Sequence, residues 1–240
     1  MAERLVSLIS GGGSTMQHIG RAIENNEIPG LEFAGVIASD ETTAATGIQR
    51  ALELGVPVFL CNPERFRGDD GQIDRYGFGQ ELIRDIKKVG GTVVTQNGWL
   101  PWTPDNVIEE FEDAIYNQHP GPLPETKNLH GMQPHATMLD FVRKTGRNEG
   151  TEVVAHRVVS GMDEGALVGV RDVAIEHTDW PKRLQKRALP VEHQLQVDVL
   201  NDHVKGQIQE MAQEYHFRRD GENKLLLASR KHARRRYPNG

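Results

Sequence analysis

Residues 5–15, Leu5-Val6-Ser7-Leu8-Ile9-Ser10-Gly11-Gly12-Gly13-Ser14-Thr15, indicate what kind of fold the chain adopts. The apolar half is typical of a strand that is buried on both faces in a parallel sheet. Three glycines follow, and Met16 to Ile23 then has the spacing of a helix. A strand, a glycine loop and a helix N-terminus can bind phosphate through backbone N–H groups and the positive helix end. The candidate phosphate ligands are Gly12, Gly13, Ser14 and Thr15.

The loop has neither the lysine of a Walker loop nor the GxGxxG spacing of a dinucleotide site. A single phosphate group therefore fits it better than a nucleotide cofactor. Ser14 and Thr15 are also common helix N-cap residues, so a purely structural role stays open.

Strands and helices alternate along the rest of the chain. Further strands are expected at 33–38, 56–60, 92–96, 114–116, 150–159 and 167–175. Helices are expected at 43–54, 73–89 and 132–144. This alternation predicts an α/β fold with a doubly wound, mostly parallel sheet, in which ligands bind at the carboxyl ends of the strands.

The segment Ile115-Tyr116-Asn117-Gln118-His119-Pro120-Gly121-Pro122-Leu123-Pro124 lies at such a strand end. Side chains two residues apart on a strand share a face, so Asn117 and His119 can point into one pocket. An amide that donates to an oxyanion, beside an imidazole that carries a proton, is the minimum set for acyl-type transfer. The alternative is a polar strand end and a proline-rich turn with no chemical role.

Two loops have both a structural and a functional interpretation. Asp163 lies between glycines, where it either caps its own backbone or orients an imidazole. Trp99, Leu100, Pro101 and Trp102 follow the strand at 92–96, where the tryptophans either fill the core or line a slot for a flat aromatic ligand.

Composition limits the classes of function. The chain has 240 residues, of which 37% are hydrophobic and 26% charged, and it has one cysteine and a net charge of −6. These values predict a soluble domain without disulfides, and they argue against general nucleic-acid binding. With no signal-peptide pattern or long apolar run, we expect a cytoplasmic protein that does not enter a membrane.

The glycine loop, the Asn117–Pro124 segment and the stretch from Gly150 through His156 to Gly165 occur in a characteristic order. Over roughly residues 4 to 200 they resemble the 10-formyltetrahydrofolate-dependent formyltransferase family. The resemblance implies a Rossmann-like fold, 10-formyltetrahydrofolate as co-substrate and no metal. It also implies formyl transfer to the amine of glycinamide ribonucleotide in purine synthesis.

The resemblance implies roles for particular residues. Asn117 would stabilise the oxyanion, His119 would carry protons, and Asp163 would orient His119 and raise its pKa. His156 would lie near the active site, and Glu192 would bind the ribose hydroxyls. The folate-binding residues would be Arg75, Trp99, Leu100, Pro101, Trp102, Val159, Ser160, Gly161 and Met162.

The chain departs from the family pattern at residues 99–102, where an arginine that is common in the family is missing. Folate chemistry on another amine, such as an amino sugar nucleotide or methionyl-tRNA, therefore stays an alternative. So do folate deformylation and a non-catalytic, ligand-binding descendant. His130 and His135 lie near the motif, but their spacing matches no standard zinc pattern.

The expected organisation is a formyltransferase domain over 1–200, with a phosphate-binding half (1–96) and a folate-binding and catalytic half (97–200). Residues 201–240 would form a C-terminal helix, a hairpin signalled by Asp220-Gly221, and a basic tail that is disordered. Lys182 to Tyr215 is expected to be mostly helical, with an interruption at Pro190. Its apolar stripe would pack on the sheet or form a dimer interface, so the protein would be a monomer or a homodimer.

Overall fold

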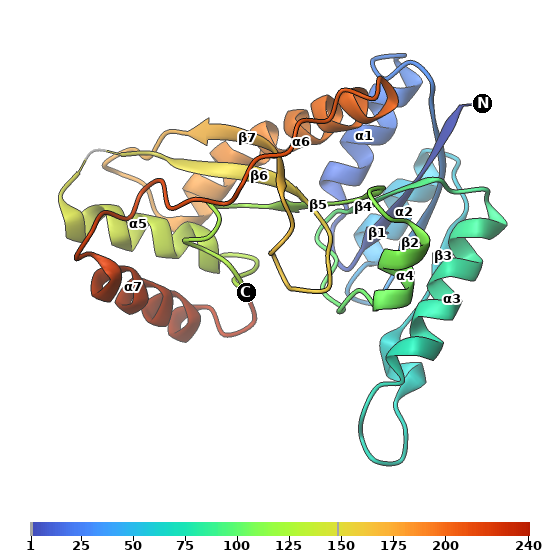
Figure 1. Cartoon of the computed structure of the whole chain (residues 1–240), viewed down its shortest axis with the longest axis horizontal. Coiled ribbons are helices and arrows are strands. Elements are labelled where there is room, and N and C mark those ends of the chain that lie inside the picture. The colour runs from blue at the N-terminus through green and yellow to red at the C-terminus, as the bar shows by residue number, and fades with distance from the viewer. Residues whose placement is uncertain (1, 148) are drawn as a thin grey trace. The chain divides into compact units, whose positions relative to one another are not determined.

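A computed structural model describes residues 2–147 and 149–240 of the chain (Figure 1). These residues pack into two compact units. The first unit contains the chain up to Asn117, together with Arg157–Gly161 and Gln196–Ile208. The second unit contains Gln118–His156, Met162–Leu195 and Gln209–Gly240. The division into phosphate-binding and folate-binding halves stays a prediction, because compact units are defined by packing and not by ligands.

The strands confirm the predicted fold class. They are β1 (Glu3–Ile9), β2 (Leu31–Ala38), β3 (Val58–Leu60), β4 (Val93–Gln96), β5 (Ile115–His119), β6 (Thr151–Arg157) and β7 (Leu167–Val173). Within the described chain the strand order is β3-β2-β1-β4-β5-β6-β7. The pairs that join β1 through β5 are parallel, whereas β6 and β7 pair antiparallel. The sheet is therefore doubly wound and mostly parallel.

Helices connect these strands. They are α1 (Ser14–Glu24), α2 (Ala45–Glu53), α3 (Arg75–Lys88), α4 (Asp105–Glu110), α5 (Gln133–Thr145), α6 (Pro181–Val204) and α7 (Asn223–Arg236), with a 3-10 turn at Pro63–Phe66. No helix among the described residues is long and apolar enough to cross a membrane.

The core of the first unit explains the uninterrupted apolar run of β1. Val6 and Leu8 pack with Ile86 of α3 in one cluster, while Ile9 packs with Met16 of α1 in another. Successive side chains of a strand point to opposite faces, and both faces of β1 are covered by helices. Every apolar position of the strand is therefore buried.

The carboxyl ends of the central strands lie level in the first unit. Leu8 of β1 pairs with Gln96 of β4, and Gln96 pairs with Asn117 of β5. The glycine loop after β1, the tryptophan loop after β4 and Asn117 therefore lie along one edge of the sheet. This is the edge where doubly wound proteins bind ligands.

Helix α6 differs from the expectation for Lys182 to Tyr215. It continues through Pro190 and ends at Val204, so the interruption and the helical continuation to Tyr215 are wrong. A proline removes one backbone hydrogen bond, but Leu184 and Leu195 are buried on either side of it and hold the helix in place. After the helix, Met211 pairs with Leu167 as an isolated bridge.

The hairpin and the disordered basic tail expected near the C-terminus are also wrong. Asp220-Gly221 lies in a turn, and the residues after it, including the basic stretch, form α7, which lies beside α5 in the second unit (Figure 1). Leu226 enters a core cluster with Met138 and Phe141, and the spacing of Leu226, Ser229 and Ala233 gives α7 one buried face. The arginines at 234–236 lie in its last turn, where the helix dipole favours positive charge.

Candidate active site

The glycine loop positions the first turn of α1. Gly13 takes the N-cap position with a φ of 64°, so neither Ser14 nor Thr15 is the N-cap. This left-handed conformation is costly for a residue with a Cβ, and a Cβ there would lie 3.0 Å from Gly47 Cα. The backbone N–H groups at the start of α1 follow directly, which is the arrangement that binds anions at a helix N-terminus.

A basic side chain that the sequence analysis missed lies at this loop. Arg50 of α2 donates from Nη1 to the Gly12 carbonyl oxygen at 2.5 Å. Gly47, one turn earlier on α2, lets the helix approach so closely, because a Cβ there would lie 2.5 Å from the Gly11 carbonyl oxygen. A half-buried arginine on an amphipathic helix belongs to no motif, so only the packing of α2 against the loop reveals it.

Gly47→Ala is expected to destabilise the protein by about 1–3 kcal/mol, because the new methyl group collides with backbone that cannot move cheaply. Thermal unfolding measures this effect. Gly11→Ala is the matched control, since a Cβ at Gly11 meets nothing within 4 Å among the described residues. An unchanged melting temperature for Gly47→Ala would show that the loop can retreat from α2.

The two tryptophans after β4 lie in different environments. Trp99 is 8% exposed and stacks on Phe78 at 6.4 Å between ring centroids, so it is part of the core. Trp102 is 37% exposed, and the Arg75 guanidinium lies 5.2 Å from its ring centroid. Trp99 therefore fills the core, whereas a ligand-binding role for Trp102 stays a prediction.

A cavity of about 790 Å³ opens in the first unit beside this loop. Leu100, Pro101, Trp102 and Arg75 line it, together with polar residues of the segments that follow β2 and β3. The backbone N–H of Leu100 donates to Ser10 Oγ at 3.0 Å, which holds the loop against the end of β1. The structure thus brings together four of the predicted folate-binding residues and assigns Trp99 to the core.

Strand β5 carries the central candidates. Asn117 is half-buried and His119 is buried, and the strand geometry directs both side chains to the same side. Gln118 lies between them and donates to Glu192 Oε2 at 3.3 Å. On a strand its side chain points to the face opposite those of Asn117 and His119.

His119 and Asp163 meet in the second unit. His119 Nδ1 lies 3.7 Å from Asp163 Oδ2, and His156 Nε2 lies 3.6 Å from Asp163 Oδ1. Both distances are in the range of an ion pair but longer than a direct hydrogen bond. Asp163 also accepts a hydrogen bond from the backbone N–H of Asn128 at 2.8 Å, and its φ of 56° is one that aspartate tolerates. The resemblance implies that these three side chains lie near one another, and the structure brings them together.

The electrostatics of this cluster correct one expectation. Burial lowers the pKa of His119 to about 4, although the charge of Asp163 acts in the opposite direction. Asp163 raises the pKa of His119 as predicted, but the loss of hydration outweighs the carboxylate, so the net shift is downward. Burial raises the pKa of Asp163, but His156, His119 and the Asn128 N–H together lower it to about 2. At neutral pH the cluster contains a neutral His119 ring beside an ionised Asp163.

Glu192 on α6 is 5% exposed. Burial raises its pKa to about 8, so much of it is protonated at neutral pH. A protonated carboxyl group can both donate and accept hydrogen bonds, which suits a pair of ribose hydroxyls. In the structure, Glu192 accepts a hydrogen bond from Gln118. The ribose-binding role of Glu192 stays a prediction.

The other candidates are spread over the two units. Val159, Ser160 and Gly161 belong to the first unit and Met162 to the second. Burial lowers the pKa of His135 to about 4, and both of its ring nitrogens lack a hydrogen-bond partner in the described part of the chain. Within that part, no group of three or more His, Cys, Asp or Glu side chains is arranged to hold a metal ion.

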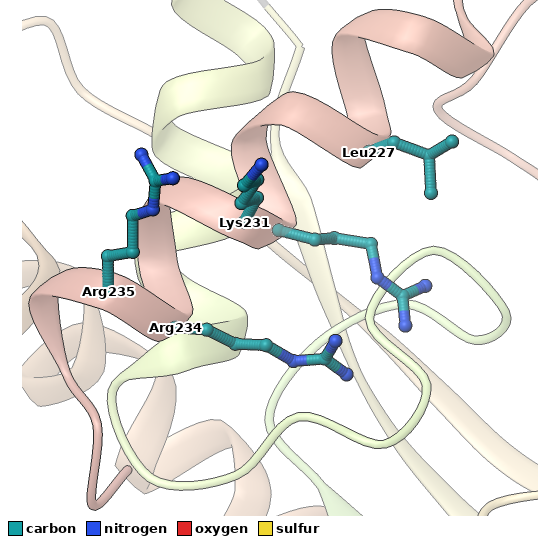
Figure 2. Close-up of a pocket in the computed structure, with 5 residues that line it drawn as sticks. Leu227, Lys231, Arg234 and Arg235 are labelled. Carbon is teal, nitrogen blue, oxygen red and sulfur yellow. The ribbon is translucent and has the colours of Figure 1, made fainter.

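A second cavity, of about 550 Å³, lies along α7. Its lining residues are Leu227, Arg230, Lys231, Arg234 and Arg235. Figure 2 shows Arg234 and Arg235 leaving α7 in different directions. The basic residues expected in a disordered tail are therefore held on a folded surface.

Comparison with known proteins identifies the family of the chain. Residues 3–200 match the family model described as formyl transferase. The chain belongs to the formyl transferase family. It is 30% identical over 206 residues to a phosphoribosylglycinamide formyltransferase of Schizosaccharomyces pombe, an alignment that covers 84% of this chain and 97% of that protein.

A second relative and a solved structure are also similar to the chain. The chloroplastic phosphoribosylglycinamide formyltransferase of Arabidopsis thaliana is 27% identical over 200 residues, which cover 82% of this chain but 64% of that one. In three dimensions the chain is similar to a glycinamide ribonucleotide transformylase of Symbiobacterium toebii. That pair has a TM-score of 0.75 at 22% identity, over 88% of this chain and 92% of the other. At this level of identity the structural similarity shows a shared fold alone.

One contact of the candidate site matches no feature predicted from the sequence. Thr126 Oγ1 lies 3.0 Å from His119 Nε2 and donates to the Pro122 carbonyl oxygen at 2.7 Å. A threonine seven residues after a histidine matches no catalytic motif. The proline-rich segment after His119 folds back so that Thr126 reaches the ring.

Proposed function

We propose that the chain transfers a formyl group from 10-formyltetrahydrofolate to the amine of glycinamide ribonucleotide in purine synthesis. The observation that carries the proposal is the buried cluster in which Asp163 lies within 4 Å of both His119 and His156. Family membership and the names of the relatives support the same activity.

The reaction exchanges one C–N bond for another. The acceptor amine attacks the formyl carbon, and the resulting tetrahedral oxyanion expels N10 of the folate. Asn117 hydrogen-bonds the oxygen as negative charge develops there. One proton leaves the attacking amine and one proton reaches N10, so the protein ends each cycle unchanged.

His119 carries the proton between these two nitrogens. Its neutral ring is a base at neutral pH, since its pKa is about 4. Asp163, which is ionised and 3.7 Å from Nδ1, stabilises the imidazolium as it forms. The same low pKa makes the neutral ring a weak base, so the proton transfer depends on the ionised Asp163 beside it.

The substrates bind through features of the first unit. The phosphate of glycinamide ribonucleotide binds to the backbone of Gly12–Thr15 at the start of α1, and Arg50 adds a positive charge at this loop. The 790 Å³ cavity accepts the folate, with Trp102 and Arg75 contacting its aromatic and carboxylate groups. Arg75, at the start of α3, thus supplies a cation beside the loop at 99–102, which lacks the usual family arginine.

The test is formyl transfer to glycinamide ribonucleotide followed by absorbance, with Arg50→Ala alongside the wild type. We expect turnover by the wild type, and for Arg50→Ala a higher KM for the ribonucleotide with an unchanged KM for the folate. Tetrahydrofolate formed without an acceptor would replace the proposal with deformylation. Folate binding without turnover would direct the assay to amino sugar nucleotides and methionyl-tRNA, and no folate binding would overturn the assignment.

A further inference from the structure

Helix α7 lies outside residues 3–200, which match the family model, and it holds the loop that follows His119. Arg230 of α7 donates from Nη1 to the Glu125 carbonyl oxygen at 3.1 Å and from Nη2 to the Lys127 carbonyl oxygen at 2.6 Å. One planar guanidinium therefore fixes the two carbonyl groups on either side of Thr126.

Further hydrogen bonds connect residues 125–128 with residues 217–234. The Glu125 side chain is fully buried, and it accepts hydrogen bonds from the backbone N–H groups of Phe217 at 2.8 Å and Arg218 at 3.3 Å. Arg234 donates to the Asn128 carbonyl oxygen at 3.4 Å. Arg230 donates two hydrogen bonds to the loop, whereas Phe217, Arg218 and Arg234 each donate one.

Both carbonyl groups that accept from Arg230 lie next to groups that contact His119 or Asp163. Thr126 lies between them, and its hydroxyl contacts His119 Nε2 at 3.0 Å. The peptide group that joins Lys127 to Asn128 accepts from Arg230 through its oxygen and donates to Asp163 Oδ2 through its N–H. A cation on the oxygen of a peptide group polarises it and strengthens its N–H as a donor.

The contact with Thr126 determines which ring nitrogen of His119 carries the proton. The single hydroxyl proton of Thr126 is donated to the Pro122 carbonyl oxygen at 2.7 Å. The hydroxyl oxygen can then only accept from the ring, so the neutral imidazole has its proton on Nε2. Nδ1 is left as the basic nitrogen, and it faces Asp163 at 3.7 Å.

We propose that Arg230 is a positioning residue, which keeps His119 in the Nε2–H tautomer and Asp163 in place by clamping residues 125–128. It acts through the loop and touches neither substrate. The kinetic part of this inference rests on the proposed function, whereas the tautomer of His119 does not.

The experiment compares Arg230→Lys and Arg230→Gln with the wild type in the full-length chain. Lysine keeps the charge but cannot hold two carbonyl groups in one plane, so it is expected to rescue little. Lys231→Gln is the matched control. This neighbouring cation lines the same cavity (Figure 2) and makes no hydrogen bond to residues 125–128 in the described part of the chain.

The first measurement is the nitrogen-15 spectrum of the His119 ring near neutral pH. In the wild type and Lys231→Gln we expect the pattern of a neutral ring protonated at Nε2. In both Arg230 variants we expect the two ring nitrogens to move toward the averaged values of a tautomer mixture. Thr126→Val, which removes the hydroxyl at nearly constant shape, is expected to give the same shift.

The second measurement is the split between kcat and KM. We expect kcat to fall about 10- to 100-fold in both Arg230 variants while both KM values stay within about 3-fold, since misplacement of a reacting group affects mainly the chemical step.

The two readouts separate failure of the inference from failure of the proposed function. A wild-type tautomer pattern in Arg230→Lys and Arg230→Gln, with kcat equal to that of Lys231→Gln, overturns the role of Arg230. An inactive wild type with the expected tautomer shifts would instead refute the formyl transfer and leave the positioning role established. If Arg230→Gln does not fold, Arg230→Lys still tests the role of Arg230. Thr126→Val tests the hydrogen bond that sets the tautomer.

Discussion

His119→Ala lowers kcat about 10³-fold, while the KM values for the ribonucleotide and the folate change little. The attacking amine must lose a proton as the tetrahedral intermediate forms, and the alanine side chain cannot accept it. Asn117 still stabilises the oxyanion, so a residual rate above that of the uncatalysed reaction remains. The measurement is steady-state formyl transfer with each substrate varied in turn.

Asp163→Asn tests the carboxylate that stabilises the protonated His119 ring. Asparagine tolerates the φ of 56° that Asp163 adopts, so the loop keeps its shape and only the charge is lost. We expect kcat to fall about 10²-fold, because the imidazolium loses the carboxylate that stabilises it. The double variant should be no slower than His119→Ala, since Asp163 acts through the ring.

The exposed His177 provides the control for this series. His177→Ala removes an imidazole without touching the cluster and should leave both kinetic constants unchanged. If His119→Ala raised only the KM values and left kcat intact, the ring would bind substrate and carry no proton.

Glu192→Gln makes the protein more stable than the wild type in mildly alkaline solution. Burial raises the pKa of Glu192 from 4.5 in the unfolded chain to about 8 in the folded one. An acid whose pKa is raised by folding stabilises fully below pH 4.5, and this contribution is lost as the pH rises through 8. Glutamine has nearly the same shape and does not ionise, so it avoids this loss.

The size of this stability difference depends on how far folding raises the pKa of Glu192. A difference of about 3.5 pKa units corresponds to roughly 5 kcal/mol in the free energy of unfolding between pH 4.5 and pH 9. Urea unfolding of wild type and variant at pH 5, 7 and 9 measures it, and the gap between them should widen with pH. His119 and His135, whose lowered pKa values affect stability between pH 4 and 6.5, contribute equally to both proteins.

Glu109→Gln, which replaces an exposed carboxylate, should stay parallel to the wild type at every pH. A Glu192→Gln curve that also stays parallel would mean that water reaches Glu192 and that its charge is hydrated in the folded protein.

The architecture could be predicted because it depends on local patterns. The run Leu5 to Ser10 and the glycines after it specify a buried strand that turns into a helix, and the same alternation repeats through β5. The hairpin near the C-terminus was predicted wrongly because Asp220-Gly221 makes a turn without specifying whether a strand or a helix comes after it. The burial of Leu226 against α5, which is a tertiary contact, makes the next segment helical.

The candidate site could be predicted only in part. Residues two apart on one strand share a face, so the pairing of Asn117 with His119 can be inferred from β geometry alone. The direction of the His119 pKa shift depends on how completely the ring is buried, which spacing along the chain does not reveal. The role of Arg230 was also hidden, because its partners are main-chain carbonyl groups that any sequence contains.

The tryptophan loop also gives the protein an optical reporter. Of the three tryptophans, Trp99 is shielded by its stack on Phe78, whereas Trp102 borders the large cavity of the first unit. A pterin or benzoyl ring that enters the cavity can accept excitation energy from the indole of Trp102. Ligand entry thus becomes visible as a loss of intrinsic fluorescence, while the emission of Trp99 registers the integrity of the core.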